Sequence, residues 1–303
     1  MEDYNMKNDY SCNNYLNLID KNDSFSSTEV KKALNRITKA VNEREKIVIC
    51  GSYDLDGITS VSLLMLILKY LNADVEYYIP DTLEKSDIFN CNVIENHITL
   101  LGASLIITVG CGINSVEEVE LCRNLGIDVI ITDYHKPKIN IPNTIVINPN
   151  RKDGIYSFEN FNAVGIVYKL ACAIAENYHM KCVEKYLDLV AIGIASSNVP
   201  LVGETLDMLE KGMSYMVNTN NHGIKAITKI NNIKKIDFLT LKEICNIVMP
   251  KVNAVGRMDD ARIVVELFTT SDSERAKRIA KYINKKKECE LKKVIFHKKT
   301  YNY

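Results

Sequence analysis

Short apolar runs alternate with longer segments of helical pattern over the first half of the chain. The runs are rich in Ile and Val and are bounded by Gly, Pro, Asn or Asp; they lie at 46–50, 75–79, 104–109, 128–132 and 144–147. The segments between them predict helices at 29–44, 58–71, 86–101 and 116–125. β-Branched runs separated by helical patterns are typical of βαβ units. We therefore predict an α/β fold with a doubly wound parallel sheet.

The second half of the chain has a mainly helical pattern. Apolar periodicity predicts helices at 162–176, 183–194, 204–217 and 240–248, and a long C-terminal helix at 271–296. We divide the chain into four parts on this basis. They are a polar arm (1–28) that we expect to be poorly ordered, an α/β core (29–205), a helical extension (206–270) and a basic connecting helix (271–303).

The composition excludes several classes of protein. The chain has 303 residues and no net charge, which argues against a strongly basic nucleic-acid binder. No apolar run approaches the ~20 residues of a membrane span, and the acidic, polar N-terminus does not resemble a signal peptide. The nine cysteines form no C-x-x-C pair, so we expect reduced thiols rather than a zinc ribbon. We expect a cytoplasmic protein without a membrane partner.

One end of the chain is strongly basic. Residues 276–303 contain ten Lys or Arg against Glu288 and Glu290, a local excess of +8. Such a segment could follow a nucleic-acid backbone. The alternative, which the sequence favours, is the solvated face of a helix.

Two carboxylates follow the first predicted strand. Asp54 and Asp56 lie in the predicted loop from Gly51 to Gly57. Two carboxylates at this spacing can turn toward one hard cation, and Mn²⁺ and Mg²⁺ prefer oxygen ligands. The alternative is a turn in which an Asp side chain caps the following helix.

A second candidate cluster follows the predicted strand at 128–132. It contains Asp133 and His135, two positions apart. Ligand sites in doubly wound folds lie at the carboxyl ends of the strands. Polar segments are predicted there at Gly51–Gly57, Pro80–Asp87, Gly110–Ser115 and Asp133–Lys136.

Seven segments, in the right order, resemble motifs of the RecJ family in the DHH phosphoesterase superfamily. They are Ile49–Ser60, Thr108–Gly112, Ile131–Pro137, Asn148–Arg151, Ala163–Val167, Asp188–Leu201 and Lys251–Met258. The resemblance implies a parallel α/β DHH domain. It also implies manganese-dependent 5′→3′ hydrolysis of single-stranded DNA, with two Mn²⁺ or Mg²⁺ ions held mainly by carboxylates.

The resemblance implies roles for particular residues. The matching metal ligands are Asp54, Asp56, Asp133 and His135, and the last two also match as catalytic residues. Gly256 and Arg257 match the late Gly-Arg, so we expect Arg257 to contact a substrate phosphate. The alternative for Arg257 is an ion pair with Asp259 or Asp260.

The chain departs from the family pattern at five site positions. Cys50 and Tyr134 stand where the family has His, and Ser52, Gly110 and Ser197 stand where it has Asp. Segment 80–87 lacks the usual Arg and GYG, and we expect the protein to lack the family's DHHA1 and OB-like domains. Because two close dications need several carboxylates, we expect a weak or partial metal site.

Three hypotheses about function follow. The first is a degenerate RecJ-like exonuclease with little or no hydrolysis that still binds single-stranded DNA or a protein partner. The second is a working phosphoesterase on nucleotides or short oligonucleotides, with one softer ion held by Cys50, Asp54, Asp56 and His135. The third is one half of a split exonuclease, completed by a partner chain that carries the missing C-terminal domain.

Overall fold

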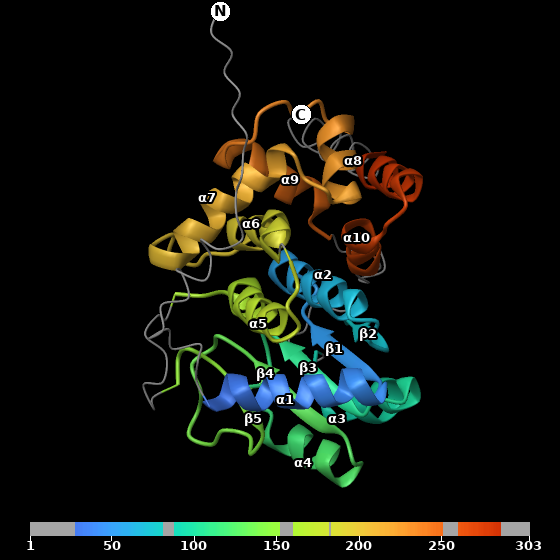
Figure 1. Cartoon of the computed structure of the whole chain (residues 1–303), viewed down its shortest axis with the longest axis vertical. Coiled ribbons are helices and arrows are strands. Elements are labelled where there is room, and N and C mark those ends of the chain that lie inside the picture. The colour runs from blue at the N-terminus through green and yellow to red at the C-terminus, as the bar shows by residue number, and fades with distance from the viewer. Residues whose placement is uncertain (1–27, 81–87, 152–159, 182, 251–259, 286–303) are drawn as a thin grey trace, which may run out of the picture.

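A parallel sheet of five strands forms the centre of the lower half of the molecule (Figure 1). The computed structural model describes residues 28–80, 88–151, 160–181, 183–250 and 260–285. The strand order is β2-β1-β3-β4-β5, and every pairing is parallel. The strands are β1 (Ile47–Gly51), β2 (Val75–Tyr78), β3 (Leu105–Val109), β4 (Asp128–Thr132) and β5 (Ile145–Ile147). The predicted doubly wound α/β fold is confirmed.

Helices cover both faces of the sheet. Side chains of Ile47 and Ile49 pack with α1 (Thr28–Glu43), α2 (Leu55–Tyr70) and α5 (Ala163–Asn177). The alternating side chains of Val48 and Cys50 pack on the other face. The elements on that face are α3 (Cys91–Val93), the π-helix η4 (Ile94–Ile98), the 3₁₀ turn η5 (Thr99–Leu101) and α4 (Val116–Asn124).

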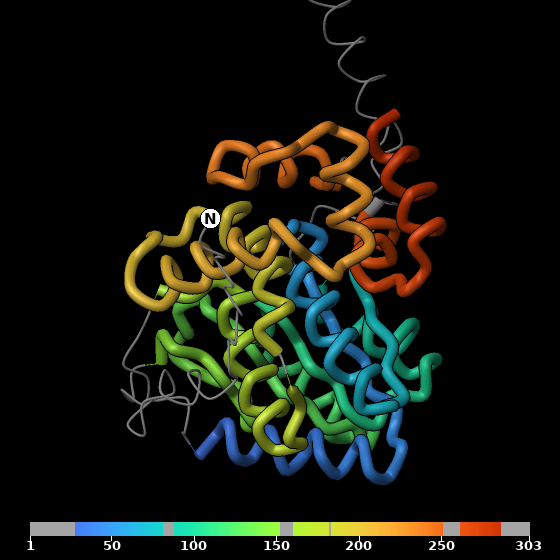
Figure 2. The backbone as a smooth tube through the Cα atoms, turned by 45° about the horizontal axis from the view of Figure 1, so that its top comes forward, coloured from blue at the N-terminus to red at the C-terminus, as the bar shows by residue number. Residues whose placement is uncertain are grey.

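A second group of helices lies beyond α2, in yellow to red at one end of the molecule (Figure 2). It contains η6 (Val183–Tyr186), α6 (Leu187–Ser196), α7 (Gly203–Val217), α8 (His222–Ile230), α9 (Phe238–Val248) and α10 (Asp260–Thr269). A further helix covers 273–285, and the rest of the predicted 271–296 helix lies outside the described residues. None of the helices in the described ranges is long and apolar enough to cross a membrane.

Helix α2 lies between the sheet and this second group. It contacts β1 on one side and α6 and α10 on the other. Its residues from Leu55 to Met65 are all buried. A helix that is apolar all round is expected in such a position, because both of its faces are covered by protein.

Helix α6 passes very close to α2 and α5 at Gly193. A β-carbon added to Gly193 would lie 2.4 Å from Thr59 Oγ1 and 2.7 Å from Val164 Cγ1. Only a glycine leaves room for this approach. The contact joins the three helices near the ends that border the candidate site.

The sequence analysis placed the start of one helix incorrectly. We expected a loop up to Gly57, but α2 begins at Leu55 and Asp54 is its N-cap. The Gly57 N–H donates to Asp54 Oδ1 at 2.8 Å, and this bond starts the helix. Asp56 therefore lies in the first helical turn rather than in the loop.

Candidate functional site

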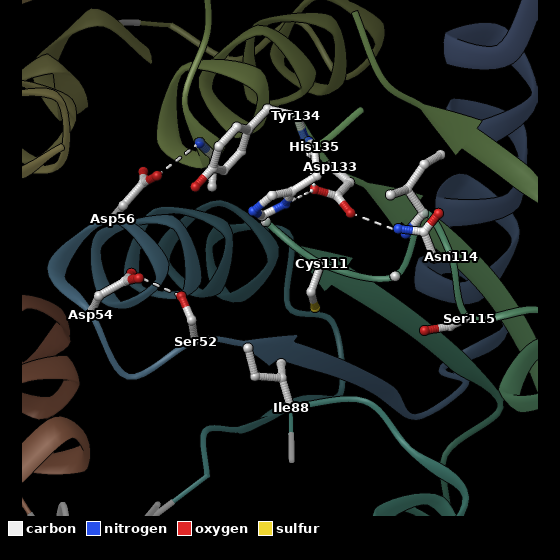
Figure 3. A pocket seen from close by; sticks show the side chains of 14 residues that line it. Ser52, Asp54, Asp56, Ile88, Cys111, Asn114, Ser115, Asp133, Tyr134 and His135 are labelled. Carbon is white, nitrogen blue, oxygen red and sulfur yellow. Dashed lines mark hydrogen bonds and ion pairs between the residues drawn. The ribbon is translucent and has the colours of Figure 1, made fainter. Parts of the chain in front are cut away.

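The candidate site is a pocket at the carboxyl ends of three neighbouring strands. Gly51, Val109 and Thr132 are in register across β1, β3 and β4, so the segments that follow them meet at one edge of the sheet. The pocket has a volume of about 200 Å³ (Figure 3). Its lining includes Ser52, Asp54, Asp56, Gly110, Cys111, Asn114, Asp133, Tyr134 and His135. A pocket therefore lies at the edge of the sheet where the sequence predicts the site.

The Asp54 side chain caps helix α2. Its Oδ1 accepts hydrogen bonds from the Gly57 N–H at 2.8 Å and from the Ser52 hydroxyl at 2.8 Å. The structure thus shows the alternative that the sequence left open, in which an Asp side chain caps the following helix. Ser52 donates to Asp54 and so takes up part of the acceptor capacity of this carboxylate.

Asp56 is almost fully buried and holds the first turn of α5. Its oxygens accept hydrogen bonds from Asn162 Nδ2 at 2.9 Å, the Ala163 N–H at 3.0 Å and the Val164 N–H at 2.9 Å. Burial, together with the charge of Asp54, raises the pKa of Asp56 to about 7, whereas the two N–H groups act in the opposite direction.

The Asp133 carboxylate is also buried, with 1 % of its side chain exposed. It accepts hydrogen bonds from the N–H groups of Ile113 at 3.0 Å, Tyr134 at 2.8 Å and His135 at 3.1 Å. His135 Nδ1 lies 2.7 Å from Asp133 Oδ1. Backbone donors from two segments therefore fix this carboxylate, and it orients the imidazole of His135 in turn.

Tyr134 and His135 form a stacked pair whose backbone is fixed by two asparagines. Their ring centroids lie 4.3 Å apart at 25°. Asn148 Nδ2 donates to the His135 carbonyl at 2.9 Å, and Asn150 Nδ2 donates to the Tyr134 carbonyl at 2.5 Å. The sequence analysis matched the Asn148–Arg151 motif but gave these asparagines no role. Asn162 was also missed as an N-cap, although it is the first residue of the helix predicted at 162–176.

Not every predicted site residue reaches the pocket. Cys50 is fully buried on β1 and belongs to the apolar cluster on the α4 face, so it does not line the pocket. Cys111 lines it instead, and burial raises the pKa of its thiol well above the usual value. Ser197 contacts the site only through Asn162, whose Nδ2 lies 3.3 Å from Ser197 Oγ. Gly256 and Arg257 lie outside the described residues.

The described residues that line the pocket form no cluster of metal ligands. Within the described ranges, no group of three or more His, Cys, Asp or Glu side chains is arranged to hold a metal ion. Both oxygens of Asp56 and of Asp133 already accept hydrogen bonds. Two dications a few ångströms apart repel strongly and need carboxylates between and around them. This set of donors does not supply them.

Comparison with protein families and curated sequences gives consistent matches. The model of the DHH family, N-terminal domain, matches residues 46–194. The single-stranded-DNA-specific exonuclease RecJ of Bacillus subtilis is 35 % identical over 263 residues, which are 86 % of this chain and 33 % of that protein. The Escherichia coli RecJ is 30 % identical, over 83 % of this chain and 46 % of that protein. The chain thus spans a third to a half of these relatives.

Solved structures agree with the fold. The crystal structure of RecJ from Thermus thermophilus in complex with Mn²⁺ has a TM-score of 0.74 and 23 % identity, and the match covers 89 % of this chain and 39 % of that one. A manganese-bound exonuclease RecJ has a TM-score of 0.77 and 22 % identity, over 89 % and 69 % of the two chains. The parallel sheet, the ordered motifs and these matches lead to one conclusion: the chain belongs to the DHH family and is a homologue of the RecJ exonucleases.

Proposed function

We propose that this chain binds single-stranded DNA and hydrolyses it weakly or not at all. The substrate class comes from its relatives, which are named single-stranded-DNA-specific exonucleases. The proposed loss of hydrolysis rests on the hydrogen bonds that the carboxylates of the pocket already accept. Each oxygen of Asp56 and of Asp133 already accepts at least one hydrogen bond, and one oxygen of Asp54 caps α2.

A single divalent ion is the most that this set of donors supports. The second oxygen of Asp54 accepts no hydrogen bond within the described part of the chain, and His135 presents its other ring nitrogen to the pocket (Figure 3). One Mn²⁺ or Mg²⁺ ion on such a partial site would be held weakly, because few anionic oxygens remain for it. A weakly held ion is a poor source of hydroxide for attack on a phosphodiester.

The test combines binding and digestion on the same samples. A fluorescently labelled oligo-dT is titrated with the protein and followed by anisotropy, with and without Mn²⁺. The same oligonucleotide, labelled at its 3′ end, is then incubated with Mn²⁺ and analysed on a gel, with the Bacillus subtilis RecJ as the active control. We expect binding that weakens with salt, and digestion at least about a thousandfold slower than by the control, as for loss of an essential catalytic element.

Manganese-dependent digestion that Asp54→Ala abolishes would show that the site was rebuilt and would overturn the proposal. Absence of binding at low salt would overturn its first half. Asp207→Asn, an exposed change on α7 away from the pocket, serves as the control for handling and purity.

A working phosphoesterase is the second candidate, and one contact favours it. The Asp133–His135 pair resembles the carboxylate–imidazole arrangement of general bases, and the imidazole borders the pocket. Hydrolysis of a chromogenic phosphodiester or of a dinucleotide, lost in His135→Ala, would support this reading. Cys50 would not be among the metal ligands of such a phosphoesterase in this structure, because its side chain does not reach the pocket.

A further inference from the structure

We propose that the ring of Tyr134 closes the position where a cation would sit in this pocket, and that Gly110 provides the room for that ring. The single replacement Tyr134→His should therefore open a cation site. This inference deepens the proposed function and rests on it, because it gives the structural reason for weak metal binding.

The ring of Tyr134 lies among the acidic side chains. In Figure 3 it is located between Asp56 and the Asp133–His135 pair, with its hydroxyl on the side of Asp56. The ring stacks on His135 and is half-buried in the pocket wall. A bulky aromatic group therefore occupies the space between Asp56 and the Asp133–His135 pair.

The hydroxyl of Tyr134 is a neutral group that can both donate and accept a hydrogen bond. A neutral hydroxyl directs a hydrogen, not an anionic oxygen, at nearby groups. It can relieve some of the repulsion among the carboxylates, but it is a poor ligand for Mn²⁺ or Mg²⁺.

Gly110 lies beside the ring of Tyr134. Its φ is +70°, a left-handed conformation that L side chains rarely adopt. A β-carbon there would lie 2.9 Å from Ala163 Cβ and 3.8 Å from Tyr134 Cε1. Ala163 cannot easily retreat, because its N–H donates to Asp56 at 3.0 Å. A β-carbon at position 110 would thus collide with the start of α5 and would be in van der Waals contact with the Tyr134 ring, so a longer side chain would meet that ring.

A simpler reading is that Tyr134 only fills space. That reading predicts that any smaller residue at this position loses stability and gains nothing. If the Tyr134 ring closes the cation position, a variant with a smaller residue that carries a ligand atom should instead bind metal more tightly. Tyr134→His and Tyr134→Phe separate the two, since the first opens the space and adds a nitrogen while the second keeps the ring.

The experiment measures Mn²⁺ binding by calorimetry and thermal unfolding with and without Mn²⁺, on the full chain and without any activity readout. We expect Tyr134→His to bind Mn²⁺ at least about tenfold more tightly than wild type, and its Tm to rise with Mn²⁺. Tyr134→Phe should bind no more tightly than wild type. Adding Asp54→Asn to Tyr134→His should remove the gain, which assigns it to this pocket.

Two results would overturn the inference. One is a Tyr134→His variant that is folded by circular dichroism and gains no affinity. The other is an equal gain in Tyr134→Phe. Both differ from failure of the proposed function, which would be seen as DNA digestion by the wild-type chain whatever the variants do.

Discussion

The side-chain amide of Asn162 donates a hydrogen bond to Asp56 at 2.9 Å, across 106 positions of sequence. The same side chain caps α5, because Asn162 Oδ1 accepts from the Gly165 N–H at 3.2 Å. One residue thus joins the start of α2 to the start of α5. The relative position of these two helix starts determines the shape of the pocket.

Asn162→Ala should destabilise the protein by about 1–3 kcal/mol, because it removes an N-cap and leaves a buried carboxylate with one donor fewer. Urea unfolding followed by circular dichroism measures the change. Asn177→Ala is the matched control, since the Asn177 side chain makes one exposed hydrogen bond to Thr38. It should cost no more than about 0.5 kcal/mol. Equal costs for the two variants would contradict the linking role of Asn162.

A second prediction concerns Gly110. Gly110→Ala should cost on the order of 2–3 kcal/mol, from left-handed strain together with the collision at Ala163. Gly102→Ala is the control, because Gly102 has a φ of +74° but nothing within 4 Å of the added β-carbon. It should lose only the strain, on the order of 1–2 kcal/mol. Gly110→Asp should be at least as unstable as Gly110→Ala and should not regain Mn²⁺ binding. A stable, metal-binding Gly110→Asp would be the contrary result.

The stability of the protein should depend on pH through Asp188. Burial raises its pKa to about 6, although hydrogen bonds from Thr219 and from the Leu189 N–H lower it. Since the folded state holds the proton more tightly than the unfolded state, this contribution is complete below about pH 4 and is lost as the pH rises through about 6. The full loss is at most about 3 kcal/mol.

Asp188→Asn removes this titration while it keeps groups that can bond Thr219 and Leu189. Urea unfolding at pH 4.5 and pH 7.5 should therefore show a smaller loss for the variant than for wild type. Asp207→Asn, at an exposed position on α7, should leave the difference between the two pH values unchanged. If Asp188→Asn keeps the wild-type pH dependence, the assignment is wrong.

The close approach at Gly193 gives a fourth prediction. Gly193→Ala should cost about 1–3 kcal/mol, because the added methyl overlaps Thr59 and Val164. Combining it with Thr59→Ala should cost less than the sum of the two single changes, because the nearest collision is then absent. Thermal unfolding of the four proteins measures the coupling. Strict additivity would mean that the helices separate easily at this point.

The strands were the easiest part of the fold to predict from sequence. Each is a short run of Ile, Val and neighbouring apolar residues, and such runs are found in strands that are buried on both faces. The parallel topology also predicted at which edge of the sheet a pocket would lie. Helices α8 and α10 were missed, since each is only nine or ten residues long and lies beside polar turns.

The site itself was predictable only in part. Asp54, Asp56, Asp133 and His135 stand in local motifs, and the structure brings all four to one pocket. The bond between Asn162 and Asp56 has no local pattern, because it joins residues that meet only after the sheet has formed. The space available at Gly110 likewise depends on Ala163 and Tyr134, which come from other segments. The roles assigned to these residues and the division of the chain into four parts stay predictions.

The burial of α2 has a consequence for how this sequence can vary. Asp54 at its N-cap and Asp56 in its first turn line the pocket, and the helix contacts the sheet on one side and α6 and α10 on the other. Adding or removing one methyl group along α2 should therefore disturb the packing against both the sheet and the second group of helices. In a library of all single substitutions, the lowest tolerance should be found along this helix, well beyond the pocket, and should follow side-chain volume rather than charge.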